Sequence, residues 1–411
     1  MTTRRSLLAG AAFAGVAGVL AGCESNPPDS TRRSPAAPDL LLAEGDTGLI
    51  MVRGSAGHQI GSAVYTPDAG TVFVTLPDGD ANTVLETLDT ATMQTRTRLG
   101  LPGRWQPRIT SPDGTIVALT APGEARQAGR EQTTILVADP SGARQRLSLA
   151  GNFQPDAFRT DGAGLFVLDW LPPKAPDRYR VRVVDLGTGK PGPLYTRDKV
   201  PVPAGAEEEM QGEGRQAVFA PGAQTLYTLY THQPDHQHTR DLLTGGRKTP
   251  VHAFVHTLDL QIGWAYCIDL PDPFGHGPAQ GHTIAIAPDG RRLFVADRTS
   301  GKLAVVNTAD LTVTKVVAIP TGTGGAGSAV SPDGAKLYLG GDSRVHVIEL
   351  VSFAVEKAWN VGRAVHGLAV SKDGQRLLVG YPGGVAWRQA GSGLEQGRLA
   401  VPGLTQLLRA I

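Results

Sequence analysis

Neither sign of charge dominates this 411-residue sequence, which has 39 basic and 38 acidic side chains and a formal net charge of +1. A protein without a net field has no general attraction for a polyanion, so we expect no nucleic-acid partner. Only 19% of the residues are charged, whereas glycine (52) and proline (30) are frequent. This composition is typical of short strands joined by tight turns, and it predicts an all-β protein.

Sequence motifs of the common enzyme classes are also absent. There is no Gly-x-Ser-x-Gly elbow, no Walker loop, no dinucleotide-binding fingerprint and no pair of carboxylates in a recognisable frame. The glycine-rich segment GTGGAG at residues 322–327 is expected in a loop between strands and opens no helix, so it is a weak candidate for a phosphate loop. The sequence therefore implies no cofactor through any of these motifs.

Cysteine is scarce, because only Cys23 and Cys267 occur. Cys23 is assigned to a lipid anchor below, which leaves a single thiol in the folded part and excludes an internal disulfide there. Cys267 lies in an expected outer strand, GWAYCIDL, and is interpreted as a small buried apolar residue. Stability must therefore come from packing.

The first 22 residues have the pattern of an export signal, with Arg4 and Arg5 followed by a small apolar run over residues 9–22. The paired arginines resemble the twin-arginine export signal, although Leu7 stands where phenylalanine is usual. General secretion is the alternative route. The run ends Leu-Ala-Gly-Cys, which resembles the lipobox of bacterial lipoproteins, and this resemblance implies that Cys23 is acylated and begins the mature chain.

Residues 1–22 are therefore predicted to be a signal peptide, and residues 23–38 a lipidated cysteine with a disordered tether. Residues 24–38 contain no apolar side chain larger than alanine, so they cannot build a core. A transmembrane anchor is the alternative, but about 17 residues of mostly alanine and glycine make a poor permanent span. We expect acyl chains to anchor the protein to the outer face of the bacterial cytoplasmic membrane.

A repeated pattern fills the predicted domain at residues 39–411: an apolar strand, a turn of the type Ser-Pro-Asp-Gly and a second apolar strand. Proline, aspartate and glycine each favour such a turn for a separate conformational reason. The seven turns are Thr66-Pro67-Asp68, Ser111-Pro112-Asp113-Gly114, Thr160-Asp161-Gly162, Ala220-Pro221-Gly222, Ala287-Pro288-Asp289-Gly290, Ser331-Pro332-Asp333-Gly334 and Ser371-Lys372-Asp373-Gly374. Their spacing of 40–67 residues suits the four-stranded blades of a β-propeller.

One complete repeat has apolar strands expected at residues 281–287, 292–297, 302–307 and 313–319. The stretches APDGRRLFVADRTSGKLAVVNTADLTVTKVVAIPTG and SPDGAKLYLGGDSRVHVIEL resemble the YVTN family of propeller repeats. That resemblance implies a β-propeller of the kind found in bacterial and archaeal surface and periplasmic proteins. It implies no reaction, because propellers serve as enzymes, receptors and scaffolds alike.

The number of blades depends on how the two ends of the chain are used. Residues 404–411 match an innermost strand, while residues 40–44 and 49–53 match the second and third strands of a blade whose outermost strand is short or missing. A propeller must join its ends or expose edge strands. We therefore expect eight blades closed by both termini, with the seven blades that the propeller family favours as the alternative.

Three long connections are expected on one face of the ring, where they mark a candidate site. They are an insertion at residues 230–250 of the fourth repeat and blade-joining loops at residues 201–214, with three consecutive glutamates, and 271–281, with His276. At the starts of the innermost strands on the same face, five side chains can hydrogen-bond or ionise: Gln106, Gln154, Arg215, His282 and His366. They predict a site for a small polar or anionic ligand or for a partner's loop, unless they merely solvate the channel.

Histidines in the insertion suggest a metal site as a second hypothesis. His232, His236 and His238 occur there with Asp235 and Asp241, and imidazole and carboxylate suit zinc or copper. The spacing does not fix a ligand geometry in a loop, so an exposed polar loop is the alternative. His252 and His256, four residues apart, are interpreted as packing within the third strand of the blade.

The sequence therefore predicts a membrane-anchored propeller lipoprotein that acts as a binding or scaffold module for a protein, peptide or envelope ligand. The alternative is an extracytoplasmic enzyme with its site on the same face, either a metal-dependent hydrolase or lactonase or a quinone-cofactor dehydrogenase. Metal content discriminates between them, because stoichiometric metal in the purified soluble domain (residues 24–411) would favour the enzyme.

Overall fold

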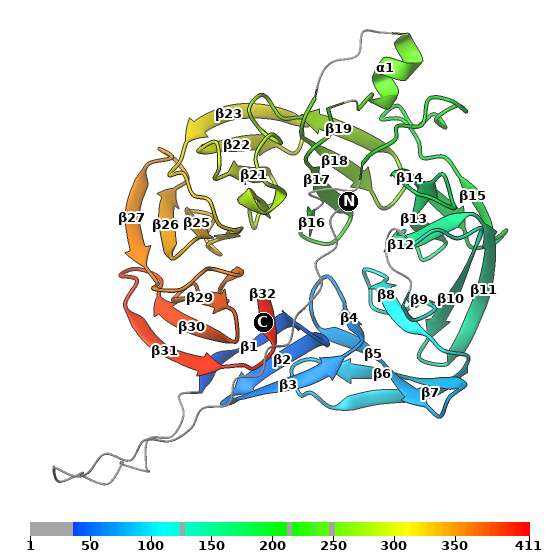
Figure 1. Cartoon of the computed structure of the whole chain (residues 1–411), viewed down its shortest axis with the longest axis horizontal. Helices are drawn as coiled ribbons and strands as arrows, with labels where there is room; N and C mark the ends of the chain where they lie inside the picture. Colours follow the sequence, from blue (N-terminus) through cyan, green and yellow to red (C-terminus); the bar gives the residue numbers. More distant parts are fainter. Residues whose placement is uncertain (1–35, 124–127, 212–215, 235, 246–250) are drawn as a thin grey trace, which may run out of the picture. The chain divides into compact units, whose positions relative to one another are not determined.

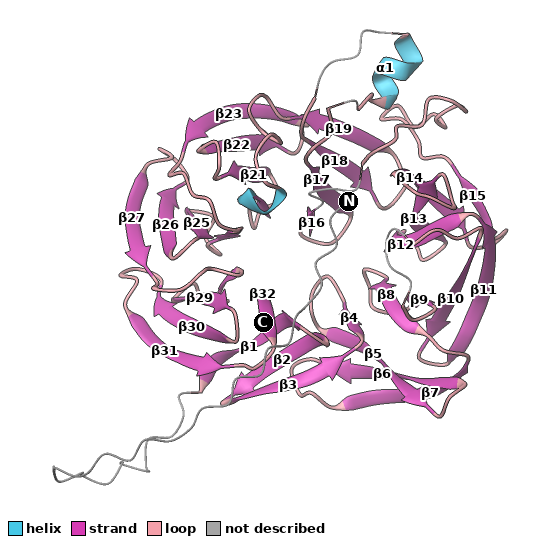
Figure 2. Ribbon diagram, viewed as in Figure 1, coloured by secondary structure: helices cyan, strands magenta, loops and turns pink. Residues whose placement is uncertain are grey.

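The computed structural model describes residues 36–411 except 124–127, 212–215, 235 and 246–250. The described chain forms eight four-stranded antiparallel sheets arranged in a ring, so the predicted β-propeller and its eight blades are confirmed (Figure 1). Figure 2 shows that strands make up nearly all of the regular structure. No helix within this part of the chain is long and apolar enough to cross a membrane. The predicted signal peptide and Cys23 lie outside the described residues.

Seven blades each use four consecutive strands that run from the channel outward (Figure 1). The first four of them comprise β4 (Ala63–Tyr65), β5 (Thr71–Asp78), β6 (Asn82–Asp89) and β7 (Thr95–Pro102); β8 (Gln106–Thr110), β9 (Val117–Thr120), β10 (Gln132–Asp139) and β11 (Gly142–Ala150); β12 (Asn152–Phe158), β13 (Gly164–Leu171), β14 (Arg178–Asp185) and β15 (Lys190–Gly192); and β16 (Gln216–Phe219), β17 (Thr225–Tyr230), β18 (Phe254–Asp259) and β19 (Ala265–Asp269). The other three comprise β20 (His282–Ile286), β21 (Arg292–Asp297), β22 (Lys302–Asn307) and β23 (Thr312–Ala318); β24 (Ala326–Val330), β25 (Lys336–Gly341), β26 (Arg344–Glu349) and β27 (Val355–Asn360); and β28 (Leu368–Val370), β29 (Arg376–Tyr381), β30 (Gly384–Gln389) and β31 (Glu395–Ala400).

The eighth blade closes the ring with strands from both ends of the chain. Its innermost strand is β32 (Leu404–Ala410), which pairs with β1 (Ala37–Gly45), and β2 (Gly48–Gly54) and β3 (Ala56–Gly61) follow outward. The outermost strand, expected to be short or missing, is present as β3. Its sequence, AGHQIG, is mostly exposed and lacks apolar alternation, which is why the pattern gave no sign of it.

The repeated turns close the hairpins between first and second strands as their chemistry predicts. In the turn before β9, Ser111 Oγ donates to Asp113 Oδ1 at 2.5 Å, and the same carboxylate accepts from the Thr115 N–H at 3.1 Å. Gly114 follows with a φ of 69°, a left-handed conformation that glycine adopts without strain. The turn motif thus satisfies its own polar groups and fixes the two flanking strands.

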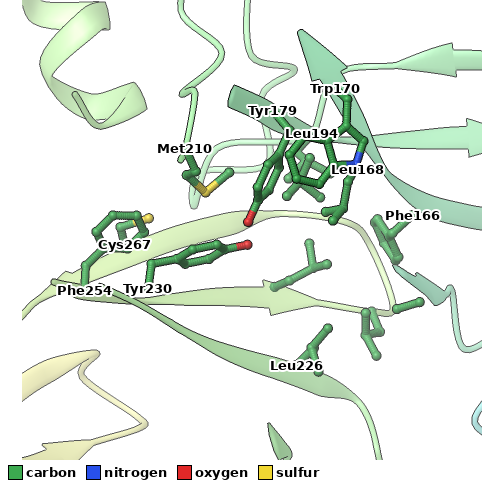
Figure 3. Packing of buried hydrophobic residues seen from close by; sticks show 14 of the residues in the cluster. Phe166, Leu168, Trp170, Tyr179, Leu194, Met210, Leu226, Tyr230, Phe254 and Cys267 are labelled. Atoms are coloured by element: carbon green, nitrogen blue, oxygen red, sulfur yellow. The ribbon is translucent and has the colours of Figure 1, made fainter. Parts of the chain in front are cut away.

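Apolar side chains fill the spaces between neighbouring blades. Between the blades of β12–β15 and β16–β19, Tyr179, Tyr230 and Phe254 form a row of buried rings with centroids 6.1 and 5.2 Å apart (Figure 3). Met210 and Cys267 belong to the same buried cluster. The connection between β15 and β16, which carries Met210, and the outer strand β19, which carries Cys267, therefore both reach this core.

Candidate metal centre

Four side chains with metal-ligating atoms meet beside this core. Glu208 comes from the connection between β15 and β16, His236 and His238 come from the insertion between β17 and β18, and Cys267 lies in β19. One ligand atom of each lies within 4.8 Å of those of the other three. The two histidines and the cysteine are at most 4% exposed. The fold thus gathers a carboxylate, two imidazoles and a thiol in a site shielded from water.

Four of the six separations between these atoms are close to those of a tetrahedral ligand set. His236 Nε2 lies 3.1 Å from His238 Nδ1, and Glu208 Oε2 lies 3.3 and 3.4 Å from those two nitrogens. Cys267 Sγ is 3.4 Å from both carboxylate oxygens of Glu208. Zinc bonds of about 2.0–2.1 Å to nitrogen and oxygen and about 2.3 Å to sulfur place tetrahedral ligands about 3.3–3.6 Å apart. Glu208, His236 and His238 are therefore already close to the spacing that zinc requires, and Cys267 has this spacing from Glu208 and lies within 4.8 Å of the imidazoles.

Both histidines are oriented from their far side. His236 Nδ1 is 3.1 Å from the carbonyl oxygen of Glu209, so a proton on Nδ1 leaves the lone pair of Nε2 directed at the cluster. His238 Nε2 is 2.6 Å from Asp269 Oδ1, an ion-pair contact that is off the line of an ideal hydrogen bond, and its Nδ1 faces the cluster. Second partners of this kind fix the tautomer of metal-binding histidines.

Arg240 secures the carboxylate behind His238. Its side chain donates to Asp269 Oδ2 at 2.6 Å and to the carbonyl oxygen of Cys267 at 2.8 Å. Arg240 belongs to the short helix α1 (Thr239–Thr244), for which His238 is the N-terminal cap residue. The His238 N–H donates to Asp241 Oδ2 at 3.3 Å, so Asp241 caps this helix. The helix therefore holds a guanidinium group over the outer strand that bears Cys267.

The glutamate-bearing connection is fastened to neighbouring elements on the C-terminal side of Glu208. Met210 and Tyr179 exchange two backbone hydrogen bonds of 2.7 and 2.9 Å. Buried Gln233 of the insertion accepts from the Gln211 N–H at 2.9 Å and donates to the Gln211 carbonyl at 2.7 Å. These contacts set the position of Glu208 against the insertion and limit how far it can move away.

Ion pairs hold Glu207, the residue that precedes Glu208. Glu207 accepts hydrogen bonds from Arg180 and Arg182 of β14 at 2.8 Å each, and Arg180 also donates to buried Asp169 at 2.9 Å. Burial raises the pKa of Asp169, and the two arginines counter this effect only in part. The charge of Glu207 is thus balanced within the blade of β12–β15, which leaves Glu208 as the carboxylate that faces the histidines.

The cluster is strongly polarised. Burial alone raises the pKa of Glu208, but its hydrogen bonds to His236 and His238 outweigh burial and hold that pKa well below its usual range. Burial lowers the pKa of His238, whereas Asp269 and Glu208 raise it to about 8. Burial, followed by the charge of Glu208, raises the pKa of the Cys267 thiol well above its usual range. The groups thus favour positive charge between Glu208 and Asp269, which a bound cation would also supply.

Apolar contacts and a small cavity complete the surroundings. The ring of Phe254 stacks on His236 with centroids 4.3 Å apart, and it meets His238 edge-on at 5.3 Å. A cavity of about 30 Å³, lined in part by Glu208, Met210 and His256, lies on the other side of the carboxylate. Such a volume accommodates one or two water molecules. His256 Nε2 is 3.8 Å from Glu208 Oε1, so a third imidazole stands just outside the four-residue set.

Of the histidines predicted in the insertion, the structure brings His236 and His238 together and leaves His232 out. His232 has a φ of 60°, and its Nδ1 is 2.8 Å from Thr231 Oγ1. Asp241 serves the helix cap described above, and Asp235 lies outside the described residues. The two histidines that join the cluster are thus two residues apart, on either side of Gln237.

The interpretations of Cys267, His252 and His256 need correction in part. Cys267 is buried as expected, but its sulfur faces the Glu208 carboxylate. His256 lies buried in β18, beside that same carboxylate. His252 precedes β18 and is not part of the strand. A signal for Cys267 was present, because residues two apart in a strand face the same side. Cys267 therefore shares one side of the outer strand with Asp269.

Among the residues that the structure describes, the side chains predicted to ring the channel mouth make no hydrogen bond or ion pair with one another. His282 is fully buried: its Nε2 accepts from the Gly275 N–H at 3.0 Å, its Nδ1 is 3.2 Å from the Pro278 carbonyl oxygen, and Asp297 lies 3.5 Å away. This corrects the expectation that His282 faces the channel, because the loop at residues 271–281 folds over it.

The other predicted mouth residues are dispersed. Gln106 and Gln154 are half-buried in β8 and β12, and His366 is exposed with its Nδ1 2.9 Å from the Thr405 carbonyl oxygen. Arg215 lies outside the described residues. Among the four that are described, no hydrogen bond or ion pair joins any two. A cavity of about 990 Å³ is lined by other residues, among them Tyr65, Arg108 and Phe219. Binding of an anion at the mouth stays a prediction.

Comparisons with known proteins agree with the fold. No protein-family model matches the sequence, and no curated protein matches it. Among solved structures, the dihydro-heme d1 dehydrogenase NirN in complex with DHE is 13% identical over 93% of this chain and 77% of its own, with a TM-score of 0.54. AztD from Citrobacter koseri is 11% identical over 90% of this chain and 96% of its own, with a TM-score of 0.55. The apo form of AztD is 12% identical, over 90% and 97% of the two chains, with a TM-score of 0.54.

These similarities show the β-propeller fold and, at such low identity, nothing finer. The resemblance of the repeats to the YVTN family stays a prediction.

Proposed function

We propose that this protein is a metal-binding propeller of the cell envelope that holds one zinc ion between Glu208, His236, His238 and Cys267. The observation that carries the proposal is the convergence of four ligand atoms within 4.8 Å, with separations of 3.1–3.4 Å among Glu208, His236 and His238 and between Glu208 and Cys267, and with both imidazoles held from behind. Hydrogen bonds and ion pairs to Glu208 hold the two imidazoles and the thiol one by one, but they give no common reason for all four groups to converge in a buried site. Zinc offers one, because it binds all four groups at once.

The chemistry of the donors favours zinc over other ions. Magnesium and calcium prefer oxygen ligands, whereas this set has one carboxylate, two imidazoles and one cysteine sulfur. Copper also accepts nitrogen and sulfur, and it is the second ion to test. Four protein ligands make a closed site, while catalytic zinc keeps a position open for water or substrate. The ligand count therefore supports a protein that holds its metal, in line with the predicted binding role.

Binding zinc would also cross-link three separate parts of the fold. Glu208 joins from the connection between blades, the histidines join from the insertion, and Cys267 joins from the outer strand. In the unfolded chain these groups are far apart in sequence, so the free energy of binding adds to the stability of the folded state. The ion thereby holds the long insertion against the blade of β16–β19.

The metal content of the purified full-length protein tests this proposal. Protein purified without chelators is expected to contain one equivalent of zinc, and the His238→Ala variant is expected to lose it because the site loses a ligand and its link to Asp269. Elemental analysis of both proteins by mass spectrometry measures the effect. His58→Ala, which removes an exposed histidine of β3, is the control that should keep the zinc. A wild-type protein without a stoichiometric transition metal, even after zinc is added, rejects the proposal.

The envelope location in the proposal is supported by the lipobox-like sequence that ends at Cys23. Cys23→Ala is expected to abolish acylation, because no other side chain can replace the thiol at the processing site, and to leave unprocessed precursor or released protein. Labelling of cells with a fatty-acid analogue measures this loss. Cys267→Ala is the matched control and should take up label normally. Label in the Cys23→Ala protein contradicts the lipoprotein assignment.

A further inference from the structure

A second group of metal-ligating side chains lies outside the buried cluster. His276 Nε2 is 3.1 Å from Asp272 Oδ1, and the ring centroids of His252 and His276 are 3.8 Å apart. One ligand atom from each of the three residues lies within 4.8 Å of the others. In contrast to the buried set, the side chains of His276 and Asp272 are 46% and 82% exposed. Two imidazoles and a carboxylate thus converge at the surface.

The loop that carries Asp272 and His276 is anchored between them. Phe274 is fully buried in the core between the blades of β16–β19 and β20–β23, and the Gly275 N–H donates to Nε2 of buried His282. The Phe274 and His276 amides also donate to the carbonyl oxygens of Pro271 and Pro273. These contacts fix the backbone on which the two exposed ligands stand. His282, predicted to bind a polar or anionic ligand at the channel mouth, instead supports a loop that presents metal ligands.

His252 connects this group to the buried cluster. Its neighbours Val251 and Ala253 are buried, and its carbonyl oxygen accepts from the Gln233 N–H at 3.1 Å. Two residues later comes Phe254, whose ring stacks on His236. Two residues of extended chain span at most about 7 Å, so the backbone of His252 lies within that distance of the residue whose ring packs on a buried ligand.

We propose that His252, Asp272 and His276 form a second site, open to solvent, that binds divalent transition metals such as zinc and copper(II). Imidazole and carboxylate ligands suit both ions, and the three side chains leave coordination positions to water. Fewer ligands, no thiolate and exposure to water make this site weaker and faster to exchange than the buried one. We assign it the capture of ions from solvent and their supply to the buried cluster. The supply role rests on the function proposed above, whereas the second site itself does not.

Titration of the metal-free full-length protein with zinc tests the second site. Calorimetry is expected to show one tight and one weak equivalent in the wild type. The double variant with His252→Ala and His276→Ala is expected to lose the weak equivalent and keep the tight one. His58→Ala is the matched control for an exposed histidine and should retain both. An unchanged weak equivalent in the double variant overturns the second site.

Cobalt(II) tests the supply role, because its bond to a thiolate gives a charge-transfer band that only the Cys267 site can produce. Stopped-flow mixing follows the growth of this band at limiting cobalt. The double variant is expected to load the buried site several-fold more slowly, with the same final band. If the double variant loses the weak equivalent but its band grows as fast as in the wild type, the supply role is overturned. A wild-type protein that binds the weak equivalent but shows no thiolate band at all refutes the buried site and leaves the second site standing.

Discussion

Deletion of residues 404–411 is expected to abolish stable folding of the propeller. These residues include the innermost strand β32 of the closing blade, where Leu404 and Leu407 are each 2% exposed. Removing two buried leucines costs about 2–5 kcal/mol each, and β1 loses the partner of its inner edge. The summed cost for the two leucines is comparable to the total stability of a typical domain, about 5–15 kcal/mol. Urea unfolding followed by circular dichroism of the full-length and truncated proteins measures the loss.

Point variants keep this prediction testable if the truncated protein cannot be purified. Leu404→Ala and Leu407→Ala are each expected to lower the free energy of unfolding by about 2–5 kcal/mol, because both side chains pack in the cluster shared with Leu41 and Leu378. Gln406→Ala, an exposed position in the same strand, should change it by no more than about 0.5 kcal/mol. If the leucine variants unfold like the glutamine variant, β32 contributes nothing to closure of the ring.

Zinc is expected to stabilise the metal-free protein strongly. A ligand at a thousandfold excess over its dissociation constant adds about 4.1 kcal/mol to the free energy of unfolding. With an unfolding entropy of about 2.1 cal/mol/K per residue, this gain corresponds to a rise in Tm of about 5 °C for a propeller of this length. Differential scanning calorimetry with and without zinc measures the rise, and a chelator should reverse it.

Two variants give this effect a structural assignment. Glu208→Gln removes a charged ligand and is expected to eliminate most of the zinc-dependent rise. Asp269→Asn removes the charge behind His238 and is expected to weaken zinc binding by about 10- to 100-fold, since partners of metal-binding histidines contribute on that scale. At the same zinc concentration the gain then falls by about 1.4–2.7 kcal/mol. If zinc raises the Tm of both variants as much as that of the wild type, the stabilising ion binds at another site.

Local patterns in the sequence were enough to predict the architecture. The Ser-Pro-Asp-Gly turns satisfy their own polar groups, as the bonds between Ser111, Asp113 and Thr115 show, so each turn marks its hairpin wherever it occurs. Apolar strands at residues 40–44, 49–53 and 404–411 similarly predicted an eighth blade from both termini. The strand that sequence reasoning missed, β3, is polar and exposed, and such a strand is held by backbone pairing that leaves no apolar pattern.

The candidate metal centre was predictable only in part. His236 and His238 were recognisable because two imidazoles stand close together in the sequence. Glu208 was placed only within a loop expected on the same face and Cys267 was interpreted as a core residue, since the two are 59 residues apart and belong to different elements. His282 was misplaced for a related reason: a polar residue at the start of an inner strand can face either the channel or a loop that folds over it. Contacts within a turn or strand depend on neighbouring residues, whereas contacts between a connection, an insertion and an outer strand depend on how the blades pack together.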